Sequence, residues 1–170
     1  MKIYNNTIFG LLLVILCMSL PSCNWFGNMA KQETNNVYNN LYLIDVNDKE
    51  LYNNVRIAGS INIAYDDLDQ TAEKLDKSYD IVFYCTDYAC TESDRAAKLL
   101  RSLGFEKVFV YSGGIHEWYL LSLKDSKNYP IEGPANLKFL SKPLMKFKRE
   151  EINAIDAKAL SELLNARRIV

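Results

Sequence analysis

Four short apolar runs, separated by segments with helical spacing, constrain what this chain can fold into more than any other feature. They are Leu41–Asp45, Ser60–Ala64, Ile81–Cys85 and Lys107–Tyr111. Continuous β-branched and aromatic runs of this length are typical of strands that are covered on both faces, as in a parallel sheet. Because strands alternate with helices, the sequence predicts an α/β domain with right-handed crossovers.

The helical spacing is clearest in two segments. Between the second and third runs, apolar residues recur at Leu68, Ala72 and Leu75. A longer helix is predicted from Ser93, with Gly104 as its C-terminal stop. Its expected apolar face consists of Ala96, Ala97, Leu99, Leu100 and Leu103.

Composition excludes several classes of protein. In 170 residues, 49% are hydrophobic and 24% charged, which supplies a packed core and excludes global disorder. Lys plus Arg is 20 and Asp plus Glu is 21, so there is no overall attraction to nucleic acid. The single histidine, His116, excludes a multi-histidine metal site, and the four cysteines are badly spaced for zinc. We therefore expect no metal and no nucleic-acid partner.

The N-terminal residues have the pattern of a targeting segment. Lys2 precedes the apolar run Ile8–Met18, which is shorter than the about 20 residues of a membrane span. The following Leu20–Cys23 resembles a bacterial lipobox, which implies a signal peptide over 1–22 and lipidation of Cys23. An ordinary signal peptide cut nearby and an uncleaved anchor are the alternatives.

The residues that follow are rich in asparagine and lack periodicity. We interpret residues 23–40 as a polar tether between the membrane and the domain. We expect an exported lipoprotein that is membrane-anchored on the periplasmic or extracytoplasmic side, which is an oxidising compartment for thiols.

Cys85 stands at the end of the third run, where parallel sheets place their ligands. It is followed by the loop Thr86–Glu92 and by the helix predicted from Ser93. Loop N–H groups and the positive end of that helix favour the thiolate, the reactive form of the side chain. A buried small hydrophobic residue is the alternative interpretation of Cys85. The residues alone leave both open.

Five motifs, in order, resemble those of a rhodanese-like domain. They are the strand Leu43–Val46, the signature Arg56–Ile63, the strand and cysteine Ile81–Cys85, the segment Gly104–Trp118 and the domain end Tyr129–Gly133. The resemblance covers residues 41–133. It implies an α/β, rhodanese-like three-layer domain with a central, mostly parallel sheet flanked by helices.

The resemblance also implies a chemistry, the movement of sulfane sulfur. Cys85 would be the catalytic carrier, taking sulfur from a donor such as thiosulfate as a persulfide and passing it to a thiol or cyanide. The partners implied are therefore a small sulfur donor and a thiol acceptor, without a cofactor. The implied substrate-binding loop consists of Thr86, Asp87, Tyr88, Ala89, Cys90 and Thr91.

The chain departs from the family pattern at three places. Asn47 replaces the usual Arg after the first motif, Arg56 replaces a usual His, and the loop after Cys85 is longer than usual. We expect Asp45, Arg56 and Arg95 to support the site. In related phosphatases an Arg stands six places after the cysteine, whereas here Thr91 does, so phosphatase activity is disfavoured.

Cys90 shares the loop with Cys85. One hypothesis is that Cys90 resolves a persulfide or sulfenate on Cys85 by forming a disulfide. This requires the two Cα atoms to approach within about 7 Å. The alternative is that Cys90 packs under the loop without reacting. Two further functions stay open: a non-catalytic rhodanese-like binding module, and a thiol–disulfide redox protein using both cysteines.

Two residues near the last motif have structural interpretations. We expect His116, at the start of a helix, to face solvent or to cap that helix. Trp118 is expected in the core.

The tail divides into two segments. Residues 134–150 carry five basic side chains and are interpreted as a basic linker, solvated by default: Lys138, Lys142, Lys146, Lys148 and Arg149. Residues 151–170 have an amphipathic helix pattern. This pattern resembles the segment just before the first strand of a rhodanese-like domain, so one interpretation is the start of a truncated second domain. The alternative is a helix that packs on the first domain.

Overall fold

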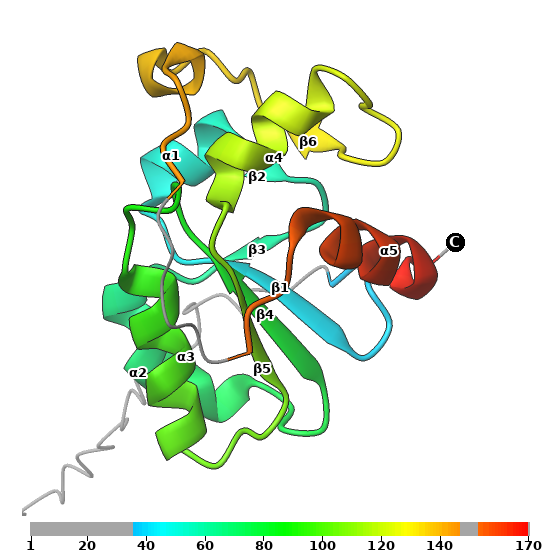
Figure 1. The fold of residues 1–170 in the computed structure, drawn as a ribbon. Helices are drawn as coiled ribbons and strands as arrows, with labels where there is room; N and C mark the ends of the chain where they lie inside the picture. The colour runs from blue at the N-terminus through cyan, green and yellow to red at the C-terminus, as the bar shows by residue number, and fades with distance from the viewer. Residues whose placement is uncertain (1–35, 147–152, 170) are drawn as a thin grey trace, which may run out of the picture. The chain divides into compact units, whose positions relative to one another are not determined.

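A four-stranded parallel sheet forms the centre of the fold, in the order β3-β1-β4-β5 (Figure 1). The strands are β1 (Leu41–Asp45), β3 (Ile61–Asn62), β4 (Asp80–Tyr84) and β5 (Val108–Tyr111). The computed structural model describes residues 36–146 and 153–169. The α/β class and the parallel sheet are as predicted, and the carboxyl ends of all four strands lie at one edge.

The second predicted strand is shorter than its apolar run. Only Ile61–Asn62 pairs with β1, because Ser60 belongs to a turn in which its N–H bonds the Ile57 carbonyl. At the other end, Ala64 precedes the 3-10 turn η1 (Tyr65–Asp67). The chain leaves the sheet edge at both points.

Alternate residues of each strand face two separate cores, which makes the domain three-layered. Ile44, Phe83 and Val110 are register partners and lie in one core. Leu43 and Val82, one residue earlier in each strand, lie in the other. The sheet is thus covered on both faces, as its apolar strands require.

The first core is covered by α2 (Leu68–Thr71) with η2 (Ala72–Lys74), and by α3 (Glu92–Ser102). The residues expected on the apolar face of α3 are buried at Ala96, Ala97 and Leu100. The expectation for Leu103 is wrong, since it is 39% exposed. α3 ends at Ser102, and Gly104, at φ +87°, turns the chain away as predicted.

The second core is covered by three helices and a small antiparallel sheet (Figure 1). The helices are α1 (Lys49–Asn54), α4 (Gly114–Ser122) and α5 (Ala157–Arg167); the sheet pairs β2 (Arg56–Ile57) with β6 (Ile131–Glu132). Trp118 of α4 is fully buried, as predicted.

His116 neither faces solvent nor caps α4, whose N-cap residue Gly113 has no side-chain partner, so both expected roles are wrong. It is 3% exposed, its Nε2 lies 3.1 Å from the Lys142 carbonyl oxygen, and its ring meets the edge of Phe139. The cause is the segment after β6, which folds back over α4 and includes η3 (Lys138–Ser141). Leu140 of η3 is 2% exposed. Residues 134–146 are therefore not a solvated linker throughout.

The C-terminal helix packs on this domain. Asp156 caps α5, and Leu160 and Leu164 enter the second core at 0% and 5% exposure. Arg167 pairs with Asp80 at the start of β4, at 3.0 Å. Of the two alternatives for this segment, the structure shows the packed helix.

The end of the predicted tether also belongs to the domain. Tyr38 is 1% exposed and donates a hydrogen bond from its hydroxyl to the Ala58 carbonyl, at 2.6 Å. The predicted signal peptide and Cys23 lie outside the described residues. Within the described part, none of the helices has the length and apolar character needed to span a membrane.

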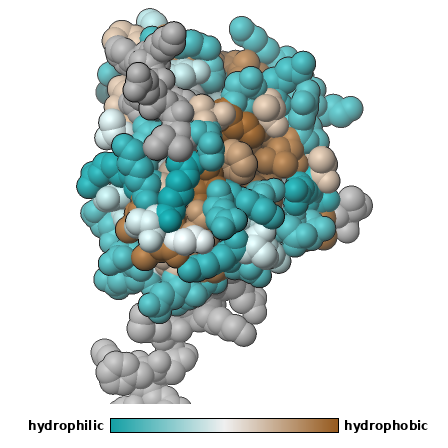
Figure 2. Space-filling model, turned by 60° about the horizontal axis from the view of Figure 1, so that its bottom comes forward, coloured by the Kyte–Doolittle hydropathy of each residue, from teal (hydrophilic) through white to brown (hydrophobic). Residues whose placement is uncertain are grey.

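Figure 2 brings forward the lower end of the view in Figure 1, away from α1 and α4. Hydrophilic residues dominate this face, and hydrophobic residues gather mainly in one area of it. The strands contribute little apolar surface, since Leu41, Val82 and Val108 are all 0% exposed.

Truncation of Leu160 tests whether α5 is an integral part of the domain. Leu160→Ala should lower the free energy of unfolding by about 2–5 kcal/mol, because it leaves a cavity in the second core. Urea denaturation measures this. Asn165→Ala, on the exposed face of α5, is the control and should change stability by no more than about 0.5 kcal/mol. Equal effects of the two substitutions would show that α5 contributes no core packing.

Candidate functional site

The loop that follows β4 holds the two cysteines together. Cys85 comes directly after Tyr84, the last residue of β4, and the loop ends where α3 begins at Glu92. Cys85 and Cys90 form a disulfide, with their Cα atoms 6.3 Å apart. The two sulfur atoms therefore meet, as the resolving hypothesis requires, and Cys90 also packs against the first core.

Cys85 is both buried and bonded. It is 1% exposed and lies in the first core, and its Sγ is 3.3 Å from the Ser93 Oγ in the first turn of α3. Cys90 is partly exposed. In this disulfide form, Cys85 does not have the expected open position before a ring of loop amides.

The loop amides explain this difference. The Ala89 N–H donates to Asp87 Oδ1 at 2.8 Å, and the Cys90 N–H donates to the Asp87 carbonyl at 3.1 Å. Asp87 thus turns the loop back on itself and carries Cys90 toward Cys85. Amides used in this way do not face an incoming anion.

The start of α4 clamps the chain where it leaves β4. The Ile115 N–H donates to the Cys85 carbonyl at 2.9 Å, and the His116 N–H donates to the Thr86 carbonyl at 3.0 Å. Gly114 makes this approach feasible: its φ is +59°, and a Cβ there would lie 2.5 Å from the Cys85 carbonyl oxygen. Sequence reasoning missed this role, although the paired glycines Gly113 and Gly114 at the start of α4 were a usable signal.

A hydrogen-bonded chain from β1 holds the same point from another side. The Thr86 hydroxyl donates to Asn47 Oδ1 at 2.8 Å, and Asn47 Nδ2 donates to Asp45 Oδ1 at 2.7 Å. Asn62 Nδ2 donates to the Asn47 carbonyl at 2.8 Å. Asp45 therefore orients the loop through Asn47, the residue at which the sequence departs from the family pattern.

Asp45 is fully buried, at 0% exposure. Burial raises the pKa of its carboxyl to about 7, although hydrogen bonds from the Asn47 backbone and side chain oppose the shift. The carboxyl is consequently half-protonated near neutral pH.

A second polar cluster holds the middle of the loop. The Tyr88 hydroxyl donates to Glu117 Oε2 at 2.9 Å, and the Tyr111 hydroxyl donates to the same oxygen at 3.0 Å. Lys146 pairs with Glu117 Oε1 at 2.7 Å, and this contact raises the pKa of Lys146. Sequence reasoning missed Glu117 and Lys146, because α4 gave no sign that one charged side chain would be buried.

The two arginines predicted to support the site have other partners. Arg56 pairs with Glu132 across β2 and β6, at 2.7 Å. Arg95 stacks over the Tyr65 ring, with its guanidinium carbon 4.2 Å from the ring centroid. Neither arginine therefore takes the place of the oxyanion-gripping Arg of the related phosphatases.

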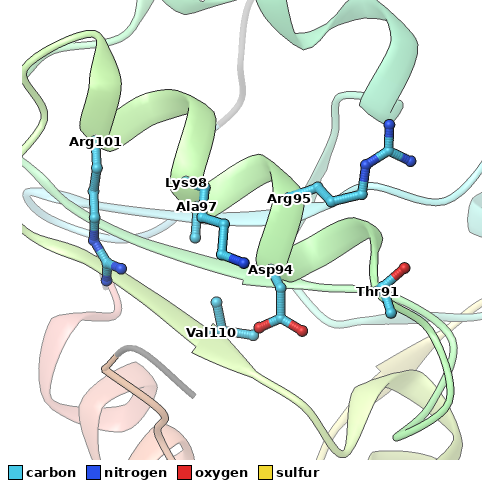
Figure 3. A pocket seen from close by; sticks show the side chains of 7 residues that line it. All are labelled: Thr91, Asp94, Arg95, Ala97, Lys98, Arg101 and Val110. Carbon is cyan, nitrogen blue, oxygen red and sulfur yellow. The ribbon is translucent and has the colours of Figure 1, made fainter. Parts of the chain in front are cut away.

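A charged depression of about 190 Å³ lies along α3, and Thr91 connects it to the loop (Figure 3). In this view, Lys98 extends toward Asp94, while Arg95 points away to a neighbouring segment. Cys85 does not belong to its lining, which consists of Thr91, Asp94, Arg95, Ala97, Lys98, Arg101 and Val110. In residues 36–146 and 153–169, no three His, Cys, Asp or Glu side chains lie close enough together to hold a metal ion.

Comparison with known protein families agrees with this fold. The family model described as the rhodanese-like domain matches residues 23–121, more than half of the chain. The chain belongs to the rhodanese-like domain family. The match contains Cys85, Cys90 and the clamp from α4.

Individual relatives are similar over about half of the chain. Thiosulfate sulfurtransferase GlpE of Tolumonas auensis is 29% identical over 76 residues, which are 45% of this chain and 70% of that protein. The protein of the same name from Coxiella burnetii is 30% identical over 78 residues, which are 46% of this chain and 71% of that protein. Among solved structures, the BH2092 protein of Bacillus halodurans is 31% identical and has a TM-score of 0.48. The match covers 58% of this chain and 67% of that protein chain.

The raised pKa of Asp45 predicts a pH dependence of stability. An unfolded aspartate titrates near pH 4, so between about pH 4 and 7 the folded protein keeps a proton that the unfolded chain has lost. The contribution of Asp45 therefore makes the free energy of unfolding fall as the pH rises through this window, by up to about 4 kcal/mol. Urea denaturation from pH 4 to 8 should show a flatter profile for Asp45→Asn. Identical slopes would contradict the buried, proton-binding carboxyl.

Gly114 provides a test of the clamp. Gly104→Ala should lower the free energy of unfolding by about 1–2 kcal/mol, the cost of a left-handed backbone conformation for alanine. A Cβ at this position would meet no atom closer than Lys77 Nζ, at 3.5 Å. Gly114→Ala adds an overlap with the Cys85 carbonyl and should cost about 1–3 kcal/mol more. Urea denaturation of both oxidised variants measures the difference. A Gly114→Ala variant as stable as Gly104→Ala would show that the turn does not press on the loop.

Proposed function

We propose that this domain transfers sulfane sulfur through a persulfide on Cys85, from a donor such as thiosulfate to a thiol or cyanide. The observation that carries the proposal is the position of Cys85, at the carboxyl end of β4 and before α3 in a rhodanese-like domain, with a sulfur that forms a covalent bond to a neighbouring thiol. The relatives from Tolumonas auensis and Coxiella burnetii support it, because they are named thiosulfate sulfurtransferases.

The reaction has two balanced half-reactions. The Cys85 thiolate attacks the outer sulfur of thiosulfate, the sulfur–sulfur bond of the donor breaks, and sulfite leaves with its electron pair. An acceptor nucleophile then attacks the outer sulfur of the persulfide and restores the Cys85 thiolate. No oxidant or reductant is consumed when the acceptor is cyanide.

The surroundings of Cys85 favour the charged sulfur that both steps require. Ser93 Oγ, at 3.3 Å, can donate to the sulfur, and the N-terminus of α3 adds positive potential. The clamp from Ile115 and His116 holds the Cys85 and Thr86 carbonyls in place. The backbone thus presents the sulfur at a constant position.

The disulfide must open before a donor can react. Cys85 is 1% exposed and already bonded to Cys90 in this structure, so the oxidised form has no thiolate. Reduction releases Cys90 and allows the loop to move. We therefore assign the sulfur-accepting state to the reduced protein.

The disulfide also favours a second candidate function. A pair of cysteines in one loop, one of them partly exposed, is a dithiol that can exchange disulfides with other proteins. This redox role needs both sulfur atoms, whereas transfer to cyanide needs only Cys85.

We further propose that the domain is exported and held at a membrane through lipidated Cys23. The support is the apolar run 8–18 and the lipobox-like Leu20–Cys23. A disulfide is consistent with an oxidising compartment.

Steady-state thiosulfate-to-cyanide turnover tests the proposed function. Reduced wild type should be active, and Cys85→Ser should lose at least about 100-fold of kcat/KM, because the nucleophile is gone. Cys90→Ser should keep activity and should no longer need reduction, because it cannot form the disulfide.

The variants also separate the alternatives. Equal turnover by wild type and Cys85→Ser would overturn the sulfur-carrier role and leave a binding module. Loss of turnover in Cys90→Ser as complete as in Cys85→Ser would favour the redox function, since transfer needs one cysteine only.

A further inference from the structure

We infer that Cys90 discharges the Cys85 persulfide as hydrogen sulfide, which makes the domain a persulfide reductase whose second substrate is a thiol reductant. The inference rests on the proposed function, since it starts from a sulfur atom already carried by Cys85. It adds an acceptor built into the loop, a different product and a partner of stated chemistry.

The loop geometry carries the inference. Cys90 reaches Cys85 with a Cα separation of 6.3 Å, while β4, α3 and the clamp from α4 stay formed. The turn at Asp87, with its bonds to the Ala89 and Cys90 amides, brings Cys90 back toward the strand end. No rearrangement beyond the loop is needed for the two sulfur atoms to bond.

An acceptor in the same loop has a large advantage over one in solution. Positioned intramolecular groups react with effective concentrations far above those of dissolved thiols. A Cys85 persulfide beside Cys90 therefore reacts with Cys90 before a dilute external thiol arrives. An external acceptor such as cyanide competes only when it is abundant.

The step balances without an added oxidant. The Cys90 thiol attacks the inner sulfur, the Cys85 Sγ, so a Cys85–Cys90 bond forms and the bond from Cys85 Sγ to the outer sulfur breaks. The outer sulfur leaves with the electron pair, takes the Cys90 proton and becomes HS⁻. The sulfane sulfur is reduced to sulfide, and the two cysteines are oxidised to the disulfide that this structure contains.

The surroundings of the two sulfur atoms set the direction of recycling. Cys90 is partly exposed and Cys85 is 1% exposed, so an incoming thiolate reaches the Cys90 sulfur. Glu92 Oε2 lies 4.0 Å from Cys90 Sγ and disfavours negative charge there, whereas Ser93 Oγ can donate to Cys85 Sγ at 3.3 Å. Cys85 is consequently the better leaving group, and reduction returns it as the reactive thiolate.

A single-turnover experiment tests the inference. Reduced protein, freed of reductant under anaerobic conditions, receives one equivalent of thiosulfate without cyanide. Wild type should release one sulfite and one hydrogen sulfide and lose both thiols. Cys90→Ser should release sulfite but keep the added sulfur as a persulfide, and its sulfide release should be about 100-fold slower or more.

Three controls make the outcomes distinct. Asn165→Ala changes an exposed residue of α5 outside the loop, keeps both cysteines and should behave as wild type. Cys90→Ala repeats the Cys90→Ser measurement without a hydroxyl, and thermal unfolding of both verifies that they fold. If no protein releases sulfite, the proposed function itself fails. If sulfite appears but wild type and Cys90→Ser keep the sulfur equally long, sulfur carriage stands and the inference is overturned.

Brief exposure of the oxidised protein to glutathione tests the direction of recycling. Alkylation followed by peptide mass spectrometry should find glutathione on Cys90 and the alkyl group on Cys85. The reverse placement would contradict the assignment of Cys85 as the leaving group.

Discussion

The site depends on two hydrogen bonds from the start of α4 to the carbonyls of Cys85 and Thr86. They form because β5, the strand before α4, is the neighbour of β4 in the parallel sheet, and because Gly114 has no side chain to hold the two backbones apart. Asp45 and Asn47, at the end of β1 on the other side of β4, hold Thr86 through a third contact. The loop therefore begins from a fixed point, while its far end is positioned by local turns.

This asymmetry explains how one loop can carry both a rigid and a movable sulfur. Cys85 is fixed by the sheet, by α4 and by its burial in the first core. Cys90 is partly exposed, packs against the edge of the first core and is positioned by the turn at Asp87 and by the disulfide. Because Cys90 is only partly buried and Cys85 is 1% exposed, movement of the opened loop disturbs less packing than displacement of Cys85 would. Loop opening therefore exposes a sulfur whose position hardly changes.

Sequence reasoning predicted the sheet and α3 because their signals are local: apolar runs for strands, and the spacing of Ala96, Ala97 and Leu100 for the helix. It was wrong about Leu103 at the end of α3, which is a local error, and about His116, whose burial depends on a distant segment. α3 ends at Ser102, which leaves its C-cap residue Leu103 exposed, and η3, from a segment interpreted as linker, covers His116. Residues that meet only through tertiary folding leave no periodic trace.

The same distinction holds for the site. Cys85, its loop and Cys90 were predicted from their place after an apolar run, and Asp45 from its place at the end of another. Three residues were missed because each acts through a partner far away in the sequence. Gly114 contacts the Cys85 backbone, Glu117 accepts from Tyr88, and Lys146 pairs with Glu117. Arg56 and Arg95 were plausible anion-binding residues by charge, but the fold gives them Glu132 and Tyr65 as partners.

The most direct measurement of the central claim is the location of the transferred sulfur. Reduced Cys90→Ser protein, treated with thiosulfate, digested and analysed by mass spectrometry, should carry one additional sulfur atom on the peptide that contains Cys85, and cyanide should remove it. A Cys85 peptide of unchanged mass, or a sulfur found on another cysteine, would contradict the account.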